Sequence, residues 1–293
     1  MRRLLITGTS GFVGGHVLFQ AWDEWETFAT YHTRVFSFPE VTTLSLDLEN
    51  ENQIRQMIEE VQPDVIIHCA AWADLEMCEH MPERAFSINA KATGILAEMC
   101  SKINCRLVYT STDMVFDGEK GNYDELDRTN PINVYGKTKL AGEEEIQASC
   151  SDYVIARAAL VYGPPLTGSN SFSERILKRV KNGEIVPLFT DQFRSPILVH
   201  NLAQALLELA KGEFKGVLHL GGADRVDRYA FGLRLAELKG FSKTLLKPVS
   251  MFENPTVAPR PRDTSLNISR ACRLLRTRLL GYKEGLKEAV EKD

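Results

Sequence analysis

The fold of this 293-residue chain is decided by Thr7-Gly8-Thr9-Ser10-Gly11-Phe12-Val13-Gly14. The stretch follows Arg3–Thr7, an apolar run of strand length, and precedes a pattern typical of a helix. Its GxxGxxG spacing gives each glycine a task. Gly8 permits a tight turn, Gly11 lets the backbone approach a pyrophosphate, and Gly14 lets the helix pack against the strand. In this context the stretch predicts a dinucleotide-binding turn, with backbone N–H groups at the helix start facing the phosphates.

The rest of the chain alternates short apolar runs with helical patterns, which predicts a parallel sheet covered by helices on both faces. Further strands are predicted at Thr27–His32, Thr43–Leu48, Val65–Cys69, Leu107–Ser111 and Tyr153–Arg157. Helices are predicted after the glycine turn, around Ile54–Val61, from about Pro82 onward and over Val134–Ala148. In the helix from Pro82 the side chains expected to be buried are Phe86, Ala92, Ile95, Leu96 and Met99. The fold class is therefore α/β, a Rossmann-type doubly wound parallel sheet with a smaller C-terminal substrate lobe.

The regular alternation weakens after Tyr162, although shorter elements are still predicted. These are helices at Phe172–Val180, Leu202–Ala210, Tyr229–Lys239 and Ser269–Leu275, and strands at Ile185–Phe189 and Val217–Leu220. We interpret residues 1–160 as a dinucleotide-binding domain. Residues 161–293 are expected to form mainly a substrate-binding lobe, with some segments returning to the main sheet.

Composition excludes several classes of protein. The net charge of −4 comes from mixed signs without a basic face, so we expect no nucleic-acid partner. Apolar runs are of strand length and the first one breaks at once into the glycine turn, which predicts a cytoplasmic protein without a signal peptide or membrane span. The six cysteines include no CxxC pair, so we expect free thiols, and no cluster predicts a metal site.

The segment after the second predicted strand favours NADP(H) over NAD(H). NAD-specific sites place an acidic residue about 20 residues beyond the turn, on the ribose 2′-hydroxyl. No Asp or Glu occurs in residues 27–39, whereas Arg34 and His32 could pair with a 2′-phosphate. Both could equally be ordinary surface residues, so NAD(H) remains an alternative. Asp47 and Leu48 are candidates for the adenine end of the cofactor, although Asp47 could simply end a strand.

Tyr135 and Lys139 are the candidate catalytic pair. Their i, i+4 spacing places them on one face of the predicted helix. A tyrosine has an ordinary pKa of about 10, and a nearby ammonium favours its phenolate form. The pair therefore suits proton donation to a carbonyl oxygen while a hydride reaches the carbonyl carbon.

Thr112 lies at the carboxyl end of a predicted strand, about where open α/β sheets bind their ligands. Its hydroxyl, or less favourably that of Ser111, could donate a hydrogen bond that polarises the carbonyl. The alternative is that Thr112 only caps a turn.

Several motifs occur together in the order and spacing of one family. They are Thr7–Gly14, His68-Cys69-Ala70-Ala71, Ser111-Thr112-Asp113-Met114-Val115-Phe116-Asp117-Gly118, Asn133–Glu143, Asp191-Gln192-Phe193-Arg194-Ser195-Pro196 and Arg260-Pro261-Arg262-Asp263-Thr264-Ser265-Leu266. Together they resemble the dTDP-4-dehydrorhamnose reductase branch of the extended short-chain dehydrogenases over almost the whole chain. The resemblance implies an oxidoreductase of dTDP-rhamnose biosynthesis. Such an enzyme transfers a hydride from NADPH to C4 of a nucleotide-linked 4-keto-6-deoxy sugar.

The resemblance also implies roles for single residues. Tyr135 would donate the proton, Lys139 would hold the nicotinamide ribose and tune Tyr135, and Thr112 would polarise the ketone. The remaining cofactor contacts would come from the turn and from the loop after the fourth strand: Gly8, Ser10, Gly11, Phe12, Val13, Gly14, Ala70 and Ala71. Asn89 would position neighbouring backbone. The candidates for substrate contact are Asp113, Arg194 and Arg260, because an arginine fork matches the oxygens of a diphosphate.

Two departures from the family pattern concern the sugar site. Met114 stands where many members carry an aromatic residue, and Leu160 stands where a tryptophan is expected. Both remove stacking surface from the sugar site and leave the catalytic residues intact. The substrate could therefore be another 4-keto sugar nucleotide or a different carbonyl compound. One alternative function is a sugar-nucleotide epimerase, because epimerases of the superfamily share the tyrosine and lysine. The altered sugar site also leaves open a non-catalytic NADP-binding subunit like the regulatory subunit of methionine adenosyltransferase. The family also implies a homodimer, paired through the helix that bears Tyr135 and the helix before it.

Overall fold

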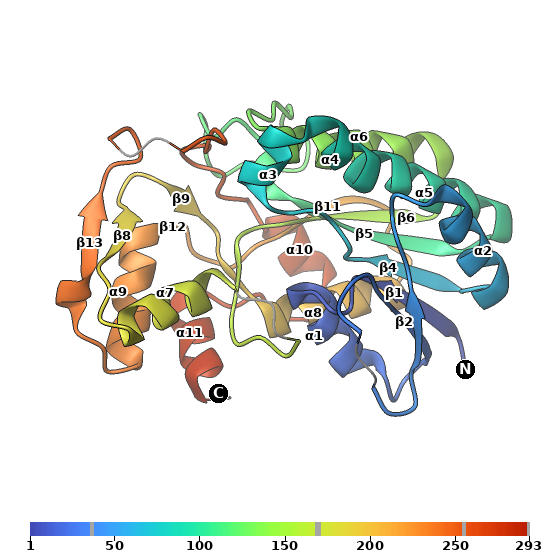
Figure 1. Cartoon of the computed structure of the whole chain (residues 1–293), viewed down its shortest axis with the longest axis horizontal. Coiled ribbons are helices and arrows are strands. Elements are labelled where there is room, and N and C mark those ends of the chain that lie inside the picture. The colour runs from blue at the N-terminus through green and yellow to red at the C-terminus, as the bar shows by residue number, and fades with distance from the viewer. Residues whose placement is uncertain (36–37, 168–170, 254–255, 292–293) are drawn as a thin grey trace.

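A parallel sheet of seven strands forms the centre of the larger lobe (Figure 1). It is seen in a computed structural model that describes residues 1–35, 38–167, 171–253 and 256–291. The strand order is β11-β6-β5-β4-β1-β2-β3, and every neighbouring pair runs parallel. The strands are β1 (Arg3–Thr7), β2 (Glu26–Tyr31), β3 (Thr42–Ser45), β4 (Val65–His68), β5 (Arg106–Thr112), β6 (Tyr153–Ala158) and β11 (Gly216–Leu220). The order reverses between β1 and β4, so the predicted doubly wound sheet is confirmed.

Helices cover both faces of this sheet (Figure 1). One face packs under α2 (Glu51–Val61), α5 (Ala92–Ile103) and α6 (Val134–Ser149), and the other under α1 (Phe12–Ala21), α8 (Val199–Lys211) and α10 (Ser269–Leu274). Strand β1 shows the reason, since its alternate side chains point to opposite faces. Leu4 and Ile6 join the core with Val17, whereas Leu5 joins the core with Ile54.

The smaller lobe has its own apolar core around Phe231. Its elements are α7 (Phe172–Lys181), β8 (Val186–Phe189), α9 (Arg228–Leu238), η3 (Lys243–Leu245), β13 (Leu246–Val249) and α11 (Tyr282–Glu291). Two short strand pairs connect the lobes: β7 (Val161–Tyr162) with β10 (Ile197–Leu198), and β9 (Phe193–Arg194) with β12 (Val226–Asp227). Sequence patterns predicted α7, α9 and β8 but not β13 or α11.

Chain from beyond residue 160 also contributes to the larger lobe. Strand β11 lies beside β6 at the edge of the main sheet, and α8 packs against α1. The division of the chain into two domains at residue 160 stays a prediction.

The helix expected from Pro82 is interrupted, and the expected burial of Phe86 was wrong. A short helix, α3 (Leu75–His80), precedes Pro82. The expected helix then consists of α4 (Pro82–Phe86), a π-helical turn η1 (Ser87–Lys91) and α5. Such a turn adds a residue to the helix and rotates the segment before it relative to the segment after it. Phe86 is therefore 41% exposed, whereas Ala92 and Leu96 are buried as expected.

The described residues contain no helix that is both long and apolar enough to cross a membrane. The six cysteines are all free thiols. Within the same residues, no group of three or more His, Cys, Asp or Glu side chains is placed to hold a metal ion.

Candidate functional site

The glycine turn between β1 and α1 has the shape that a pyrophosphate requires. Gly8 has a φ of +73°, and a Cβ there would lie only 2.7 Å from Cα of Ala70. A Cβ on Gly14 would collide with the carbonyl group of Gly8, so both positions require glycine. Gly11 is the N-cap of α1, and no side chain of the described residues caps the helix there. The first-turn N–H groups are therefore available to an anion.

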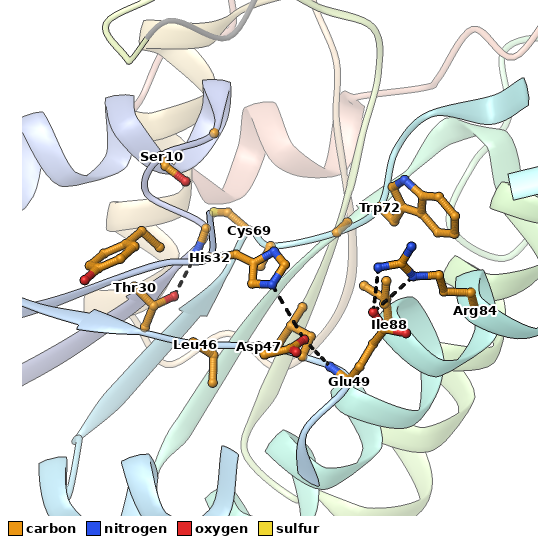
Figure 2. Close-up of a pocket in the computed structure, with 16 residues that line it drawn as sticks. Ser10, Thr30, His32, Leu46, Asp47, Glu49, Cys69, Trp72, Arg84 and Ile88 are labelled. Atoms are coloured by element: carbon orange, nitrogen blue, oxygen red, sulfur yellow. Dashed lines mark hydrogen bonds and ion pairs between the residues drawn. The ribbon is translucent and has the colours of Figure 1, made fainter. Parts of the chain in front are cut away.

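A cavity of about 340 Å³ opens beside this turn (Figure 2). Its walls include eight of the residues that the sequence predicts for the cofactor: Gly8, Ser10, Gly11, His32, Asp47, Leu48, Ala70 and Ala71. Side chains that the sequence did not single out also line it: Thr30, Tyr31, Leu46, Glu49, Cys69, Trp72, Arg84 and Ile88. The other residues predicted to contact the cofactor are not among the lining residues: Phe12, Val13, Gly14, Arg34, Tyr135 and Lys139. The cavity and the turn together fit a dinucleotide.

One rim of the cavity is closed by a bridge that sequence reasoning missed. Arg84 of α4 stacks over the ring of Trp72, with its Cζ 5.1 Å from the ring centroid, and donates to Glu49 Oε2 at 2.8 Å. Figure 2 shows these side chains meeting across the end of the cavity. On the neighbouring wall Asp47 Oδ1 accepts from the Glu49 N–H and lies 3.9 Å from His32 Nε2. The bridge joins Glu49, Trp72 and Arg84, which lie in three separate segments, so no local sequence motif predicts it.

Arg34 lies against the glycine turn, although it does not line the cavity. Its Nη1 donates to the carbonyl of Thr167 at 3.0 Å, and the Thr167 hydroxyl donates to the carbonyl of Gly11 at 2.9 Å. The arginine is therefore held near the start of α1 by a protein acceptor. Its contact with a 2′-phosphate stays a prediction.

Thr112 and Tyr135 are brought together at the carboxyl end of β5. Thr112 ends the strand, and Tyr135 lies in the first turn of α6, whose N-cap Asn133 accepts from the Gly136 N–H at 2.8 Å. Burial and the charge of Asp113 raise the pKa of Tyr135, while a hydrogen bond with Thr112 works against that rise. The sequence led us to expect Lys139 to lower this pKa. Burial prevails instead, and the phenol stays protonated.

Lys139 is buried one helical turn beyond Tyr135, as predicted from its spacing. Its Nζ lies 4.0 Å from the ring centroid of Tyr109. Burial lowers the pKa of Lys139 to about 7, against the opposing effects of Glu143 and Cys69. The Lys139 ammonium is stabilised by the face of the Tyr109 ring and by the charge of Glu143. Hydrogen-bond acceptors on a bound ligand would stabilise it further.

Arg194 is fully buried, and its guanidinium bonds to groups of the protein. Its guanidinium donates to the carbonyls of Phe193, Pro261 and Arg262, and its Nε lies 3.5 Å from Asp113 Oδ2. Asp113 also accepts from the hydroxyl of Thr264 at 2.7 Å. These contacts join the end of β5 to the segment around residue 262. Substrate contact by Arg194 or Asp113 stays a prediction.

A second arginine that the sequence did not single out lies in the same region. Arg228, at the start of α9, donates from Nε to Gln192 Oε1 at 2.9 Å and stacks over Phe172. Its pKa is lowered by burial and by the charges of Arg194 and Arg260. Within the described residues its Nη1 and the Gln192 Nε2 are buried without a partner. Unpaired buried donors among like charges are typical of a site for an anionic ligand.

Arg260 has a partner across the site. Its Nη2 donates to Glu76 Oε1 of α3 at 2.6 Å, and Glu76 Oε2 accepts from the Ala258 N–H at 2.9 Å. The side chain of Arg260 is only partly exposed. Its proposed contact with a diphosphate would compete with this ion pair.

Comparison with known proteins decides the family. Residues 1–293 match the family model described as the RmlD substrate binding domain. The chain belongs to this family. It is 32% identical to dTDP-4-dehydrorhamnose reductase of Mycolicibacterium smegmatis, over 99% of this chain and 85% of that protein. It is also 30% identical to methionine adenosyltransferase 2 subunit beta of Bos taurus, over 99% of this chain and 87% of that one.

The RmlD family fold is found in solved structures as well. A crystal structure of dTDP-4-dehydrorhamnose reductase from Bacillus anthracis in complex with NADP matches with a TM-score of 0.88 and 26% identity, covering 100% of both chains. The family resemblance predicted from the motifs is therefore confirmed, as is the Rossmann-type fold class. The RmlD substrate binding domain description covers the full chain, the glycine turn included.

Proposed function

We propose that this protein is an NADP(H)-dependent oxidoreductase that reduces the keto group of a nucleotide-linked sugar. The best-supported substrate is dTDP-4-dehydrorhamnose, reduced at C4. The observation that carries the proposal is the placement of Thr112, which ends β5, beside Tyr135 in the first turn of α6, in a chain whose glycine turn and cavity fit a dinucleotide. Similarity to a reductase along 99% of this chain, and to a solved reductase structure that it covers completely, supports the assignment.

The residues present fit the cofactor segment by segment. The first turn of α1 and the glycines of the turn would hold the pyrophosphate, and Ala70 and Ala71 would lie along the ribose on the nicotinamide side. Asp47 and Leu48 would face the adenine, and His32 with Arg34 the 2′-phosphate. When bound, the reduced nicotinamide supplies a hydride.

The protein's own part in the reaction is proton delivery and polarisation. The Tyr135 hydroxyl is protonated at neutral pH and would donate its proton to the carbonyl oxygen. Burial raises its pKa in the cofactor-free protein, so donation depends on charges that the reaction brings to the site. The Thr112 hydroxyl would shift from Asp113 Oδ1, 3.2 Å away, to the same oxygen. Lys139 would bind ribose hydroxyls and hold its positive charge beside the developing phenolate.

The substrate side is proposed to lie under the arginine cluster of Arg194, Arg228 and Arg260. Of these, Arg228 is the best candidate to bind a diphosphate, because its Nη1 is buried without a partner among the described residues. Met114 and Leu160 leave the sugar itself with less aromatic contact than the family pattern provides.

The test is NADPH consumption, followed by its absorbance, with dTDP-4-dehydrorhamnose as the ketone. We expect substrate-dependent oxidation of NADPH and formation of the 4-hydroxy sugar. Tight NADPH binding without turnover of this or any other 4-keto sugar nucleotide would contradict the proposal. It would favour a binding subunit like the bovine relative. Interconversion of epimers without net NADPH loss would instead indicate an epimerase.

Replacing Arg34 by alanine tests the choice of cofactor. Loss of a charged hydrogen bond to a phosphate costs about 1.5–3 kcal/mol, so we expect KM for NADPH to rise by roughly tenfold or more. KM for NADH should change by less than about twofold, because NADH lacks the 2′-phosphate. Arg179→Ala, which removes another partly exposed arginine far along the chain, is the control and should change neither value. Equal losses for both cofactors would exclude a 2′-phosphate role.

A further inference from the structure

His68 is a buried imidazole, only 1% exposed, that the proposed chemistry does not use. It ends β4, next to the loop that lines the cofactor cavity. Its Nδ1 lies 2.6 Å from the Thr7 hydroxyl, and its Nε2 lies 3.2 Å from the Thr93 hydroxyl. A histidine with both ring nitrogens bonded to neutral hydroxyls has two tautomers open to it, and its neighbours decide between them.

The groups around the two hydroxyls show which atom carries the proton in each of these hydrogen bonds. Thr93 Oγ1 donates to the carbonyl of Asn89 at 2.8 Å, a shorter contact than the 3.4 Å from the Tyr109 hydroxyl to the same oxygen. A carbonyl oxygen can only accept, so the Thr93 proton points there. Thr93 must then accept from His68, which places the imidazole proton on Nε2. Burial and the charge of Lys139 lower the pKa of His68 to about 3, so Nδ1 is bare and accepts from Thr7. Thr7 Oγ1 in turn accepts from the Ala70 N–H at 3.2 Å.

This series of hydrogen bonds ends at two groups that contact opposite sides of the proposed site. At one end is Ala70, whose Cα packs against Gly8 of the phosphate turn. At the other is Asn89 in the π-helical turn, whose side-chain amide bonds both the N–H and the carbonyl of Trp72, at 2.8 and 3.0 Å. The loop of residues 70–72 is therefore tied down at its start through His68 and at its end through Asn89.

The same network continues to the helix that carries the catalytic pair. Asn89 Nδ2 donates to the Thr138 hydroxyl at 3.0 Å, and that hydroxyl donates to the carbonyl of Tyr135 at 2.8 Å. His68 also stacks on Tyr109, with ring centroids 5.6 Å apart, and Lys139 Nζ lies over the same Tyr109 ring. A neutral imidazole is favoured there, because a protonated His68 would place a second positive charge against the Tyr109 ring that the Lys139 ammonium already contacts.

We propose that His68 is a positioning residue for hydride transfer. In its Nε2-protonated neutral form it fixes the loop of residues 70–72 relative to the helix bearing Tyr135 and Lys139. It touches neither cofactor nor substrate. The inference rests on the proposed function for its kinetic consequence, and on the hydrogen-bond geometry and burial of His68 for its tautomer.

Thr93→Val tests the kinetic consequence, since valine keeps the shape of threonine and removes the hydroxyl. The change breaks the link from His68 to Asn89 and leaves the Thr7–Ala70 side intact. We therefore expect kcat to fall by about tenfold to hundredfold, as small misplacements near the reacting atoms do, while KM for NADPH changes less than about twofold. Thr93→Ser, which restores the hydroxyl, should recover most of the lost kcat.

Thr27→Val is the matched control, because Thr27 is buried too and, among the described residues, its hydroxyl donates to the local carbonyl of Trp25. It should lower thermal stability without lowering kcat of the folded enzyme. If Thr93→Val also lowers only stability, or raises only KM, His68 is a structural histidine and the proposal fails.

Nitrogen-15 NMR of the histidine ring tests the tautomer without any substrate. One histidine should carry its proton on Nε2 at neutral pH, and its signals should shift in Thr93→Val more than those of the other histidines. An Nδ1-protonated or charged ring at that position would overturn the assignment. A wild-type enzyme that turns over no ketone would refute the proposed function, and the NMR result would still decide the arrangement of His68.

Discussion

Tyr135→Phe is expected to lower turnover by about 10²–10⁴-fold, the range in which a positioned general acid contributes. The hydroxyl is the proposed proton donor, and phenylalanine removes it without removing the ring. NADPH affinity should change by less than about twofold, because the glycine turn and the cavity walls are untouched. The measurements are initial rates with saturating ketone and equilibrium titration of NADPH.

The matched control is Tyr153→Phe at the start of β6, at the opposite end of that strand from the proposed catalytic residues. It should leave both turnover and NADPH affinity unchanged. Near-normal turnover in Tyr135→Phe would remove the tyrosine from the mechanism. A water molecule or the Thr112 hydroxyl would then have to supply the proton.

Lys139→Met should have two opposite effects: turnover falls by about 10²-fold or more, and the cofactor-free protein becomes more stable. Turnover falls because no ammonium remains to hold the ribose and face the phenolate. Stability rises because burial lowers the pKa of Lys139 from its ordinary 10.5 to about 7, so the folded state holds this charge poorly. Methionine fills a similar volume and has no charge to desolvate.

The stability effect has a direction in pH that can be checked. Between about pH 7 and 10.5 the unfolded chain holds the lysine proton more firmly than the folded one, so the wild-type free energy of unfolding rises with pH. In urea unfolding of the cofactor-free proteins, the advantage of Lys139→Met should therefore be largest at about pH 7 and smaller at about pH 9. A variant less stable than the wild type at neutral pH would show that the ammonium is well solvated in the folded protein.

The sheet and its phosphate turn could be predicted from sequence because their signals are local. A strand buried on both faces is an unbroken apolar run, as at residues 65–67, and a turn that must approach a phosphate carries its glycines at fixed offsets. The spacing of Tyr135 and Lys139 gave their shared helix face for the same reason. None of these inferences required knowledge of distant contacts.

The features that sequence could not supply depend on residues far apart in the chain. Arg194 has a residue type usually found on surfaces, and it is buried because carbonyls 67 and 68 positions later surround its guanidinium. The π-helical turn at Ser87–Lys91 leaves no periodic signature, so the outward rotation of Phe86 was missed. The pKa of Tyr135 is raised by desolvation and by the Asp113 carboxylate, which i, i+4 spacing to Lys139 does not reveal.

Strand β11 has a consequence for how the chain is made. When residue 160 leaves the ribosome, β6 still lacks its outer neighbour, and α1 still lacks the helix that covers it. Both arrive only after α7 and β8 of the smaller lobe have been synthesised. The nucleotide-binding half therefore completes its sheet late in translation, and until then it presents an open edge of the kind that chaperones shield from aggregation.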